Sequence, residues 1–240
     1  MIDGSAGSEG VLFVVATPIG NLGDITLRAI DVLKGVDYYA GENFESLLRI
    51  ASRFFPDKKI SKRNFFKMNQ ATERKIAPKI VSVLQKGHDV ALLTDAGTPS
   101  ISDPGWMVAD LAQKRGIRVV PIPGPSAFVA AFSASGFEPA PFVFIGFLPR
   151  KGRASFLKKY APPHFRGHFI VYVSPHRLRE ELRFLRDFFG GEREAFLVKE
   201  LTKVYERYWR APLEELVKKV YSFDEHESKG EWVLVIRGNK

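Results

Sequence analysis

The stretch DVALLTDAGTPSISDPG, residues 89–105, decides how this chain folds. Residues 90–93 are a short apolar run that predicts a buried β-strand at 89–94, and the next eleven residues contain two prolines, two glycines and two aspartates. Neither a helix nor a strand can continue through that composition. In open α/β sheets ligands bind where strands end, so this rigid polar turn is a candidate binding loop.

Strand-like and helix-like segments alternate on both sides of this stretch up to residue 122. The expected strands are residues 11–17, 36–40, 89–94 and 118–122. The expected helices are residues 24–35, 45–55, 72–85 and 106–115. Asp24 is expected to cap the first helix and Gly35 to end it. This alternation predicts an α/β fold with a mostly parallel sheet and helices on both of its faces.

The proline-rich sequence PIPGPS, residues 121–126, interrupts the alternation and predicts a domain boundary. The second half has more strands for each helix, which predicts a mixed sheet. After a helix at 126–135, strands are expected at 142–147, 168–174, 194–202 and 231–238, with helices at 176–189 and 211–221. The predicted organisation is a flexible tail at 1–10, an N-terminal α/β domain at 11–122 and a C-terminal α/β domain at 123–240.

The composition excludes several classes of protein. No window approaches eighteen consecutive apolar residues, so we expect a cytoplasmic protein with no membrane contact. Cysteine is absent, which removes disulfides, thiolate metal sites and cysteine nucleophiles. His164 and His168 are four residues apart, but Gly167 and the prolines before His164 disfavour a helical metal pair. Neither a G-x-x-x-x-G-K-[ST] phosphate loop nor a G-x-G-x-x-G after a strand occurs.

The net charge of +9 is concentrated in two basic blocks. Residues 49–86 contain eleven basic and two acidic side chains, and residues 150–166 contain six basic and no acidic ones. Phenylalanines at 54–55 and 65–66 lie within the first block, and cations among aromatic rings suit nucleic acid. The alternative is a solvated basic surface whose phenylalanines point into the core. The residues expected to bind RNA are Lys58, Lys59, Lys62, Arg63, Arg150, Lys151 and Arg153.

Three irregular turns each follow a predicted strand of the first half. They are TPIGN at 17–21, the turn that begins at Asp95, and PGPSA at 123–127. Each offers main-chain groups and small side chains, and three turns at strand ends can converge on one cleft. Each turn alone could be purely structural, but as an ordered set they favour a site that binds a cofactor through its main chain.

Six motifs carry a resemblance to a known family: ATPIGNLGDITLRA, LLTDAGTPSISDPGW, PIPGPSA, FIGFLPRK, KELTK and GEWVLVIRG. They closely resemble the ribosomal RNA small subunit methyltransferase I family of the tetrapyrrole methylase superfamily, from about Leu12 to Gly238. The resemblance implies two α/β domains with S-adenosylmethionine in the cleft between them, and a homodimer. It also implies 2′-O-methylation of a cytidine ribose in the decoding region of small-subunit (16S) rRNA, so the expected partner is that rRNA or the 30S subunit.

The resemblance also implies where the cofactor binds. Pro18 would border the site, and Ser126 and Ala127 would meet the cofactor near the domain junction. Val173, at the end of a strand in the second domain, would touch the adenosine. The methionine and sulfonium side would be lined by Asp95, Ala96, Gly97, Thr98 and Ile101. Glycine and alanine allow close approach of the backbone, and oxygen ligands suit a sulfonium cation.

Three polar stretches depart from the family pattern. Residues 42–45 read ENFE where Glu-Asp-Thr-Arg is typical, and residues 67–70 read KMNQ where a histidine-rich stretch ending in Asn-Glu is typical. After KELTK the chain continues VYER instead of His-Glu-Glu. The candidates for accepting the proton of the attacking hydroxyl are therefore Glu42, Asn69, Lys199 and Glu200. Lys199 and Glu200 are expected to alternate on a strand, so that only one faces the cleft.

These departures leave several interpretations open. The chain is either a working rRNA methyltransferase with rearranged substrate contacts, or a methylase of another RNA or of a tetrapyrrole-like small molecule. A third interpretation is an RNA-binding protein that has kept the cofactor fold but lost catalysis. Glu42 could likewise serve only to cap the following helix or to pair with an arginine.

Overall fold

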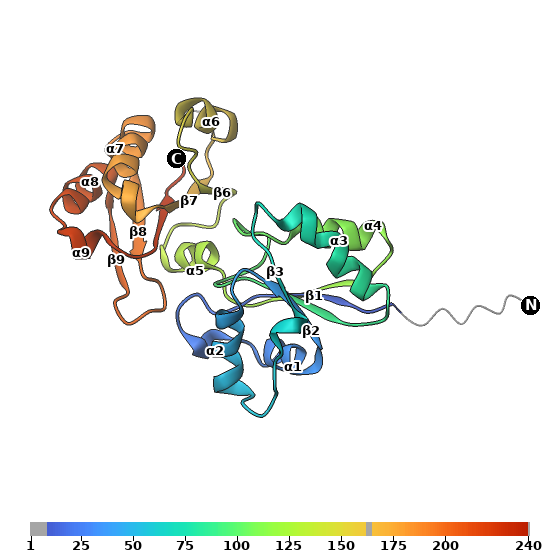
Figure 1. Ribbon diagram of the computed structural model, residues 1–240. Helices are drawn as coiled ribbons and strands as arrows, with labels where there is room; N and C mark the ends of the chain where they lie inside the picture. Colours follow the sequence, from blue (N-terminus) through green and yellow to red (C-terminus); the bar gives the residue numbers. More distant parts are fainter. Residues whose placement is uncertain (1–8, 162–164, 240) are drawn as a thin grey trace, which may run out of the picture. The chain divides into compact units, whose positions relative to one another are not determined.

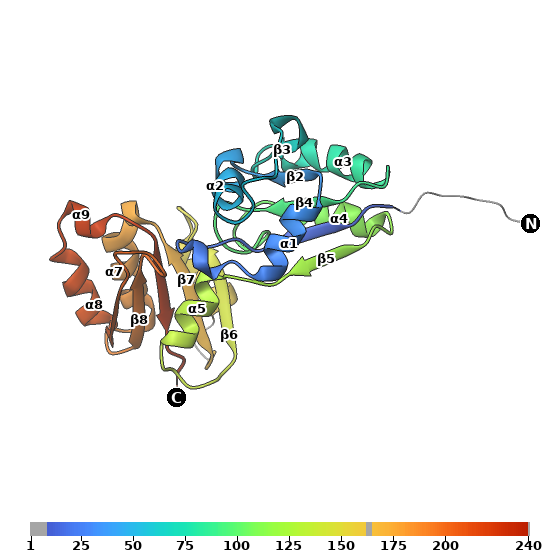
Figure 2. The same cartoon turned by 90° about the horizontal axis from the view of Figure 1, so that it is seen from below.

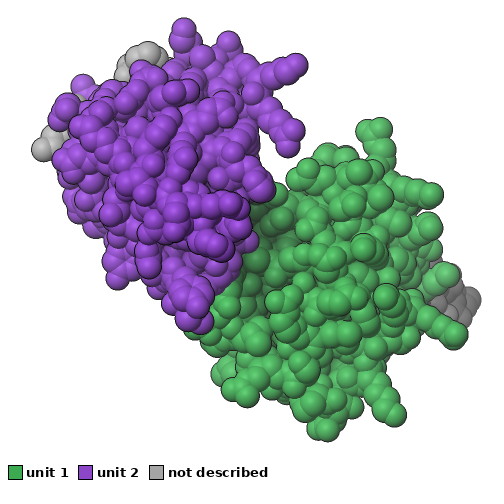
Figure 3. All heavy atoms as spheres, turned by 60° about the vertical axis from the view of Figure 1, so that its left-hand side comes forward, with its two compact units in different colours: residues 1–126 green, residues 127–240 purple. Residues whose placement is uncertain are grey.

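The computed structural model describes residues 9–161 and 165–239. The chain divides into two compact units, Met1–Ser126 and Ala127–Lys240, which are coloured separately in Figure 3. Each unit is built around one five-stranded sheet (Figure 1). Most of the predicted tail at 1–10 lies outside the described residues. Gly10, however, already packs into the first unit, because its main-chain N–H donates to the Leu84 carbonyl at 2.8 Å.

The sheet of the first unit is entirely parallel, with strand order β3-β2-β4-β1-β5 (Figure 2). Its strands are β1 (Leu12–Val15), β2 (Tyr38–Gly41), β3 (Phe65–Lys67), β4 (Val90–Leu93) and β5 (Val119–Ile122). Its α-helices are α1 (Leu27–Gly35), α2 (Phe44–Phe54), α3 (Glu73–Leu84) and α4 (Trp106–Lys114). Short 3₁₀ helices, η1 (Leu22–Asp24) and η2 (Lys62–Asn64), complete the unit.

Alternation along β4 explains why helices cover both faces of this sheet. Ala91 and Leu93 pack with α1 and α2, whereas Val90 and Leu92 pack with α3 and α4. Successive side chains of a strand point to opposite faces, so a continuous apolar run requires a cover on each side. The predicted parallel α/β architecture is therefore confirmed.

Two local expectations in this unit are wrong. Thr26 caps α1, because its Oγ1 accepts a hydrogen bond from the Ala29 N–H at 3.2 Å, whereas Asp24 ends η1. The three-residue edge strand β3 was not expected at all. Its sequence, Phe-Phe-Lys, is too short to show the period of a strand.

The sheet of the second unit is mixed, as predicted, with strand order β6-β7-β10-β8-β9. Only β6 and β7 are parallel, and the other neighbours are antiparallel. The strands are β6 (Phe142–Phe147), β7 (His168–Val173), β8 (Glu194–Lys199), β9 (Arg207–Pro212) and β10 (Trp232–Ile236). The helices are α5 (Ala127–Ala134), α6 (Arg153–Tyr160), η3 (Pro175–Arg177), α7 (Leu178–Phe189), α8 (Leu213–Tyr221) and α9 (Glu225–Ser228).

The strand expected at 194–202 is shorter than predicted. It ends at Lys199, because Glu200 and Thr202 have positive φ angles of 53° and 66° and belong to a tight loop. Lys199 and Glu200 therefore do not alternate on one strand. The edge strand β9 and the cationic helix α6 were not expected, since neither has a clear apolar stripe.

Buried His168 has a structural role. The ring lies 5.7 Å from the Phe137 ring, its Nε2 donates to the Glu138 carbonyl, and its Nδ1 accepts from the Gly238 N–H. His164, the other histidine of the metal pair considered from the sequence, lies outside the described residues. Among residues 9–161 and 165–239, no three His, Asp or Glu side chains are grouped to hold a metal ion. No helix in those ranges is long and apolar enough to span a bilayer.

A buried carboxylate fixes the far end of the turn that follows β4. Glu73, at the start of α3, is 2% exposed, and its Oε1 accepts from the N–H groups of Gly105 (2.8 Å) and Met107 (2.9 Å). Gly105 precedes α4 and has no side chain of its own with which to cap that helix. Glu73 therefore satisfies two amides that helix formation leaves without partners.

We expect Glu73→Ala to lower the free energy of unfolding by about 2–4 kcal/mol, because one buried and one partly buried N–H group lose their acceptor. Glu73→Gln keeps an acceptor oxygen and should cost less. Urea titration followed by circular dichroism measures both effects. Asp31→Ala, at an exposed position of α1, is the matched control; an equal loss in the two alanine variants would show that the cap contributes nothing.

Candidate functional site

Three turns lie side by side at one edge of the first sheet. Residues 17–21 follow β1, residues 95–105 follow β4 and residues 123–126 follow β5. In the strand order β4, β1 and β5 are neighbours and all are parallel, so their carboxyl ends share an edge. Parallel strands of this kind place the loops that bind ligands together.

Hydrogen bonds join these three turns into one surface, which we call the joined turns. Thr17 and Gly97 exchange two main-chain hydrogen bonds, with N···O distances of 2.9 and 3.0 Å. The Thr17 hydroxyl donates to the Thr94 carbonyl at 3.0 Å, and the Thr98 hydroxyl donates to the Pro125 carbonyl at 3.1 Å. The turn after β4 is therefore hydrogen-bonded to both of its neighbours.

Two glycines are needed for this arrangement, for different reasons. Gly97 has φ +87°, a conformation that other residues adopt only with strain. Gly124 is needed for space, because a Cβ there would lie 3.0 Å from the Cβ of Ala16. Gly97 thus permits the backbone conformation of its turn, and Gly124 leaves room for the Ala16 side chain.

The adjacent strand β2 adds a second carboxylate to the same edge. A Cβ on Gly41, the last residue of β2, would lie 2.8 Å from the Leu93 carbonyl oxygen, so the ends of β2 and β4 are very close. Glu42 and Asn43 follow directly. The Asn43 Nδ2 donates to Asp95 Oδ2. Burial, and then the nearby Asp95 carboxylate, raise the pKa of Glu42 above its ordinary value.

Residues 11–217 match the family model of the Tetrapyrrole (Corrin/Porphyrin) Methylases. The chain is 43% identical over 231 residues to "Ribosomal RNA small subunit methyltransferase I" of Pseudomonas aeruginosa, covering 96% of this chain and 80% of that protein. It is 40% identical over 236 residues to the protein of that name from Escherichia coli O157:H7, covering 97% and 79%. The chain belongs to the ribosomal RNA small subunit methyltransferase I family.

Solved structures independently support the fold. A uroporphyrin-III-C-methyltransferase from Thermus thermophilus aligns with a TM-score of 0.64 at 18% identity, covering 95% of this chain and 94% of that one. A diphthine synthase aligns with a TM-score of 0.68 at 14% identity, covering 95% and 89%. These similarities concern the architecture of two α/β units alone.

In this member of the methyltransferase family, most residues expected to bind the cofactor lie along the joined turns. Pro18 and Gly97 are buried, Asp95 and Ile101 are exposed, and the rest of this group is half-buried: Ala96, Thr98, Ser126 and Ala127. Small side chains beside an exposed carboxylate fit a ligand that carries a positive charge and is held through the main chain. These residues therefore fit the positively charged part of S-adenosylmethionine.

Val173 differs from these residues. It is the last residue of β7 and only 1% exposed, and its side chain packs in the core of the second unit with Leu178 and Trp232. Any contact that it makes with a cofactor must come from its main chain.

Three of the four candidate proton acceptors have structural partners. Asn69 Oδ1 accepts from the N–H and the hydroxyl of Thr72, both at 3.0 Å, just before α3. The Lys199 ammonium donates to the Glu227 carbonyl beside α9. Glu200 Oε1 accepts from the Glu231 N–H at 2.7 Å and from the Lys203 ammonium at 3.0 Å. Of the two candidates in the first unit, Glu42 lies beside the joined turns, whereas Asn69 lies just before α3.

Among the residues expected to bind RNA, some have structural partners and the others are exposed. The Lys58 ammonium donates to the carbonyls of Lys34 and Val36, and burial lowers its pKa. Arg153 forms an ion pair with Glu180 at 2.6 Å. These two cations therefore support the fold. The exposed cations that remain are Lys59, Lys62, Arg63, Arg150 and Lys151.

The phenylalanines of the first basic block pack inward, as the alternative interpretation held. Phe55 is buried, and Phe54 and Phe65 pack against the cluster formed with α1 and α2. Phe66 packs against the cluster on the opposite face of the sheet. Base stacking on these rings is therefore not supported, and the first block offers charge alone.

Proposed function

We propose that this protein transfers a methyl group from S-adenosylmethionine to the ribose 2′-hydroxyl of a cytidine in the decoding region of small-subunit rRNA. The observation that carries the proposal is the Glu42–Asn43–Asp95 group beside the joined turns, in a chain about 40% identical to proteins named for rRNA methylation. We further propose that it acts as a homodimer in the cytoplasm, where the small subunit is assembled.

The bound cofactor supplies a methyl group already activated on a sulfonium, so little covalent chemistry is asked of the protein. Asp95, Ala96, Gly97 and Thr98 hold and orient the charged end through carboxylate and main-chain groups. The Glu42 carboxylate accepts the proton of the ribose hydroxyl. Its raised pKa suits that task, since a stronger base takes a proton from a hydroxyl more readily.

Unmethylated small subunits and labelled S-adenosylmethionine test the proposal directly. We expect one 2′-O-methylated cytidine, located by mass spectrometry of nuclease fragments. Transfer to an RNA base or to another RNA would replace the proposed substrate. Turnover of a tetrapyrrole without RNA, undiminished at high salt, would favour the small-molecule alternative. RNA binding without any transfer would identify a binding protein. Light scattering of the purified protein reports the oligomeric state.

The exposed cations near η2 should supply part of the affinity for RNA. We expect the triple variant Lys59→Ala, Lys62→Ala and Arg63→Ala to bind RNA about tenfold more weakly at 0.15 M salt. The slope of log Kd against log salt should fall by about 2, because each lost phosphate contact removes about 0.7–0.9 from it. Fluorescence anisotropy measures both quantities.

Lys58→Ala is the control for this prediction, because its ammonium is bound to carbonyls at the end of α1. It should lower the midpoint of thermal unfolding while leaving the salt slope unchanged. A salt slope that falls as much in Lys58→Ala as in the triple variant would contradict the assignment.

A further inference from the structure

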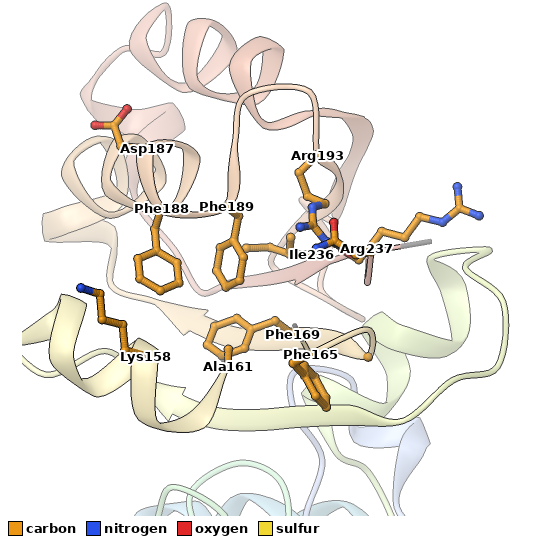
Figure 4. A pocket seen from close by; sticks show the side chains of 12 residues that line it. Lys158, Ala161, Phe165, Phe169, Asp187, Phe188, Phe189, Arg193, Ile236 and Arg237 are labelled. Carbon is orange, nitrogen blue, oxygen red and sulfur yellow. Dashed lines mark hydrogen bonds between the residues drawn. The ribbon is translucent and has the colours of Figure 1, made fainter. Parts of the chain in front are cut away.

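The second unit contains a hollow of about 460 Å³ between α6, the end of α7 and the ends of β7 and β10 (Figure 4). Lys158 and Ala161 line it from the side of α6, and Phe188 and Phe189 from α7. The β7 residue Phe169 forms its floor together with Ile236. Phe165 stands at its edge.

Aromatic rings form a continuous wall in this hollow. The Phe169 and Phe189 rings lie 5.2 Å apart between centroids, and the Phe189 and Phe188 rings lie 5.0 Å apart in a T-shaped arrangement. Phe169 is buried in the core, but Phe188 and Phe189 are only partly covered. Partly covered ring faces beside a hollow are suited to stack against a flat apolar group.

Two positive charges in the hollow have no acidic partner in the part of the chain that the structure describes. Arg193 Nη1 donates to the Arg237 carbonyl at 3.0 Å, and burial lowers the pKa of the Arg193 guanidinium. Within residues 9–161 and 165–239, neither Arg193 nor Lys158 forms an ion pair. By contrast, Arg237 pairs with Glu138 and Glu194, and Asp187 pairs with Arg186. A guanidinium presents five N–H donors in a planar fork, and this arrangement suits the oxygens of a phosphate.

The hollow lies at the opposite end of β7 from Val173. Phe169 is near the start of that strand and Val173 is its last residue, so about 13 Å of extended chain separates them. The hollow is therefore distinct from the end of β7 at which a cofactor contact was expected. It is continuous instead with α6, whose basic residues have no part in the transfer reaction described above.

We propose that this hollow binds one unpaired nucleotide of the RNA substrate, with its base against Phe188 and Phe189 and its phosphate at Arg193 and Lys158. The inference rests on the proposed RNA substrate and adds to it a second point of attachment. Stacking of a base on aromatic rings, combined with arginine or lysine at the backbone, is how proteins hold single-stranded RNA. Residues 150–166 contain six cations and no acid, and those other than the paired Arg153 add positive charge to this unit.

Fluorescence anisotropy with a labelled fragment of small-subunit rRNA tests this site. Phe188→Ala should weaken RNA binding about tenfold with no change in the salt slope, because stacking is not an ionic contact. Arg193→Ala should weaken binding to a similar extent and lower the slope by about 0.7, the value of one single-strand phosphate contact. Phe188→Trp should restore the affinity, since it restores an aromatic face.

Arg115→Ala removes an exposed arginine of the first unit and is the matched control for charge. Suppose that the wild-type protein binds and methylates RNA. Equal RNA affinity in Phe188→Ala, Arg193→Ala and Arg115→Ala would then overturn the inference about the hollow and leave the proposed function intact. Failure of Phe188→Trp to restore binding would also overturn it, because Phe188 would then act only by packing. A wild-type protein that binds no RNA would overturn the proposed substrate as well.

Discussion

Replacing Glu42 with glutamine should slow methyl transfer by about 10²- to 10⁴-fold, the usual contribution of a positioned general base. Glutamine has nearly the same shape but cannot accept the proton of the ribose hydroxyl. The affinity for S-adenosylmethionine should stay within about twofold of wild type, because the proposed cofactor site is formed by the turns after β1, β4 and β5. Single-turnover transfer of a labelled methyl group, with calorimetry for binding, separates the two effects.

The proposed role of Glu42 also predicts the direction in which the transfer rate changes with pH. The base must be ionised, so the rate should rise as pH increases through the pKa of Glu42. Burial and the Asp95 carboxylate raise that pKa, and the rise should therefore occur at a higher pH than for an ordinary glutamate. Asp95→Asn removes the neighbouring charge and should move the rise to lower pH.

Glu45→Gln is the matched control, because Glu45 is an exposed carboxylate three residues further along, in the first turn of α2. It should leave both the rate and its pH dependence unchanged. A Glu42→Gln variant that retains full activity would show that Glu42 is not the proton acceptor. It would then be only a half-buried side chain beside α2.

Replacing Asp95 with asparagine should weaken binding of S-adenosylmethionine about tenfold, as expected for the loss of one charge-assisted contact. S-adenosylhomocysteine has no sulfonium charge, so its affinity should fall much less. The ratio of the two dissociation constants, measured by calorimetry, reports the electrostatic part alone. An equal loss for both ligands would mean that Asp95 does not face the sulfonium.

Asn43 should act through Asp95, since its Nδ2 donates to the Asp95 carboxylate. Asn43→Ala frees that carboxylate to rotate, and we expect about threefold weaker binding of S-adenosylmethionine. In the Asp95→Asn background the same substitution should have no further effect, because coupled residues are not additive. Additive losses in the double variant would contradict this role for Asn43.

Much of the fold could be predicted because its signals are local. The strand β4 lies within the predicted residues 89–94, since its apolar run is bounded by residues that end strands. The missed elements lack such a signal. Edge strand β9 has no buried residue and includes a proline, and helix α6 is strongly cationic with only Leu157 fully buried. Pairing with β8 and packing on the second core stabilise these elements.

The candidate site could be predicted only in part for a similar reason. Turns built from glycine, proline and small residues are visible in sequence, because their backbone conformations depend on residue type. The uses of long polar side chains are not visible. Lys58 and Lys199 were expected to contact RNA or substrate, but each ammonium instead binds main-chain carbonyls at the end of a helix.

The sequence by itself determined two α/β units, three turns at strand ends and a concentration of positive charge. Apolar runs, helix stops and turn residues depend on neighbours a few positions away, so they can be identified along the chain. Only the tertiary structure decided which polar groups remain free for chemistry. Asn43 meets Asp95 across 52 residues and Glu73 meets Gly105 across 32. No local pattern encodes such contacts, because they arise only when separate strands and helices pack together.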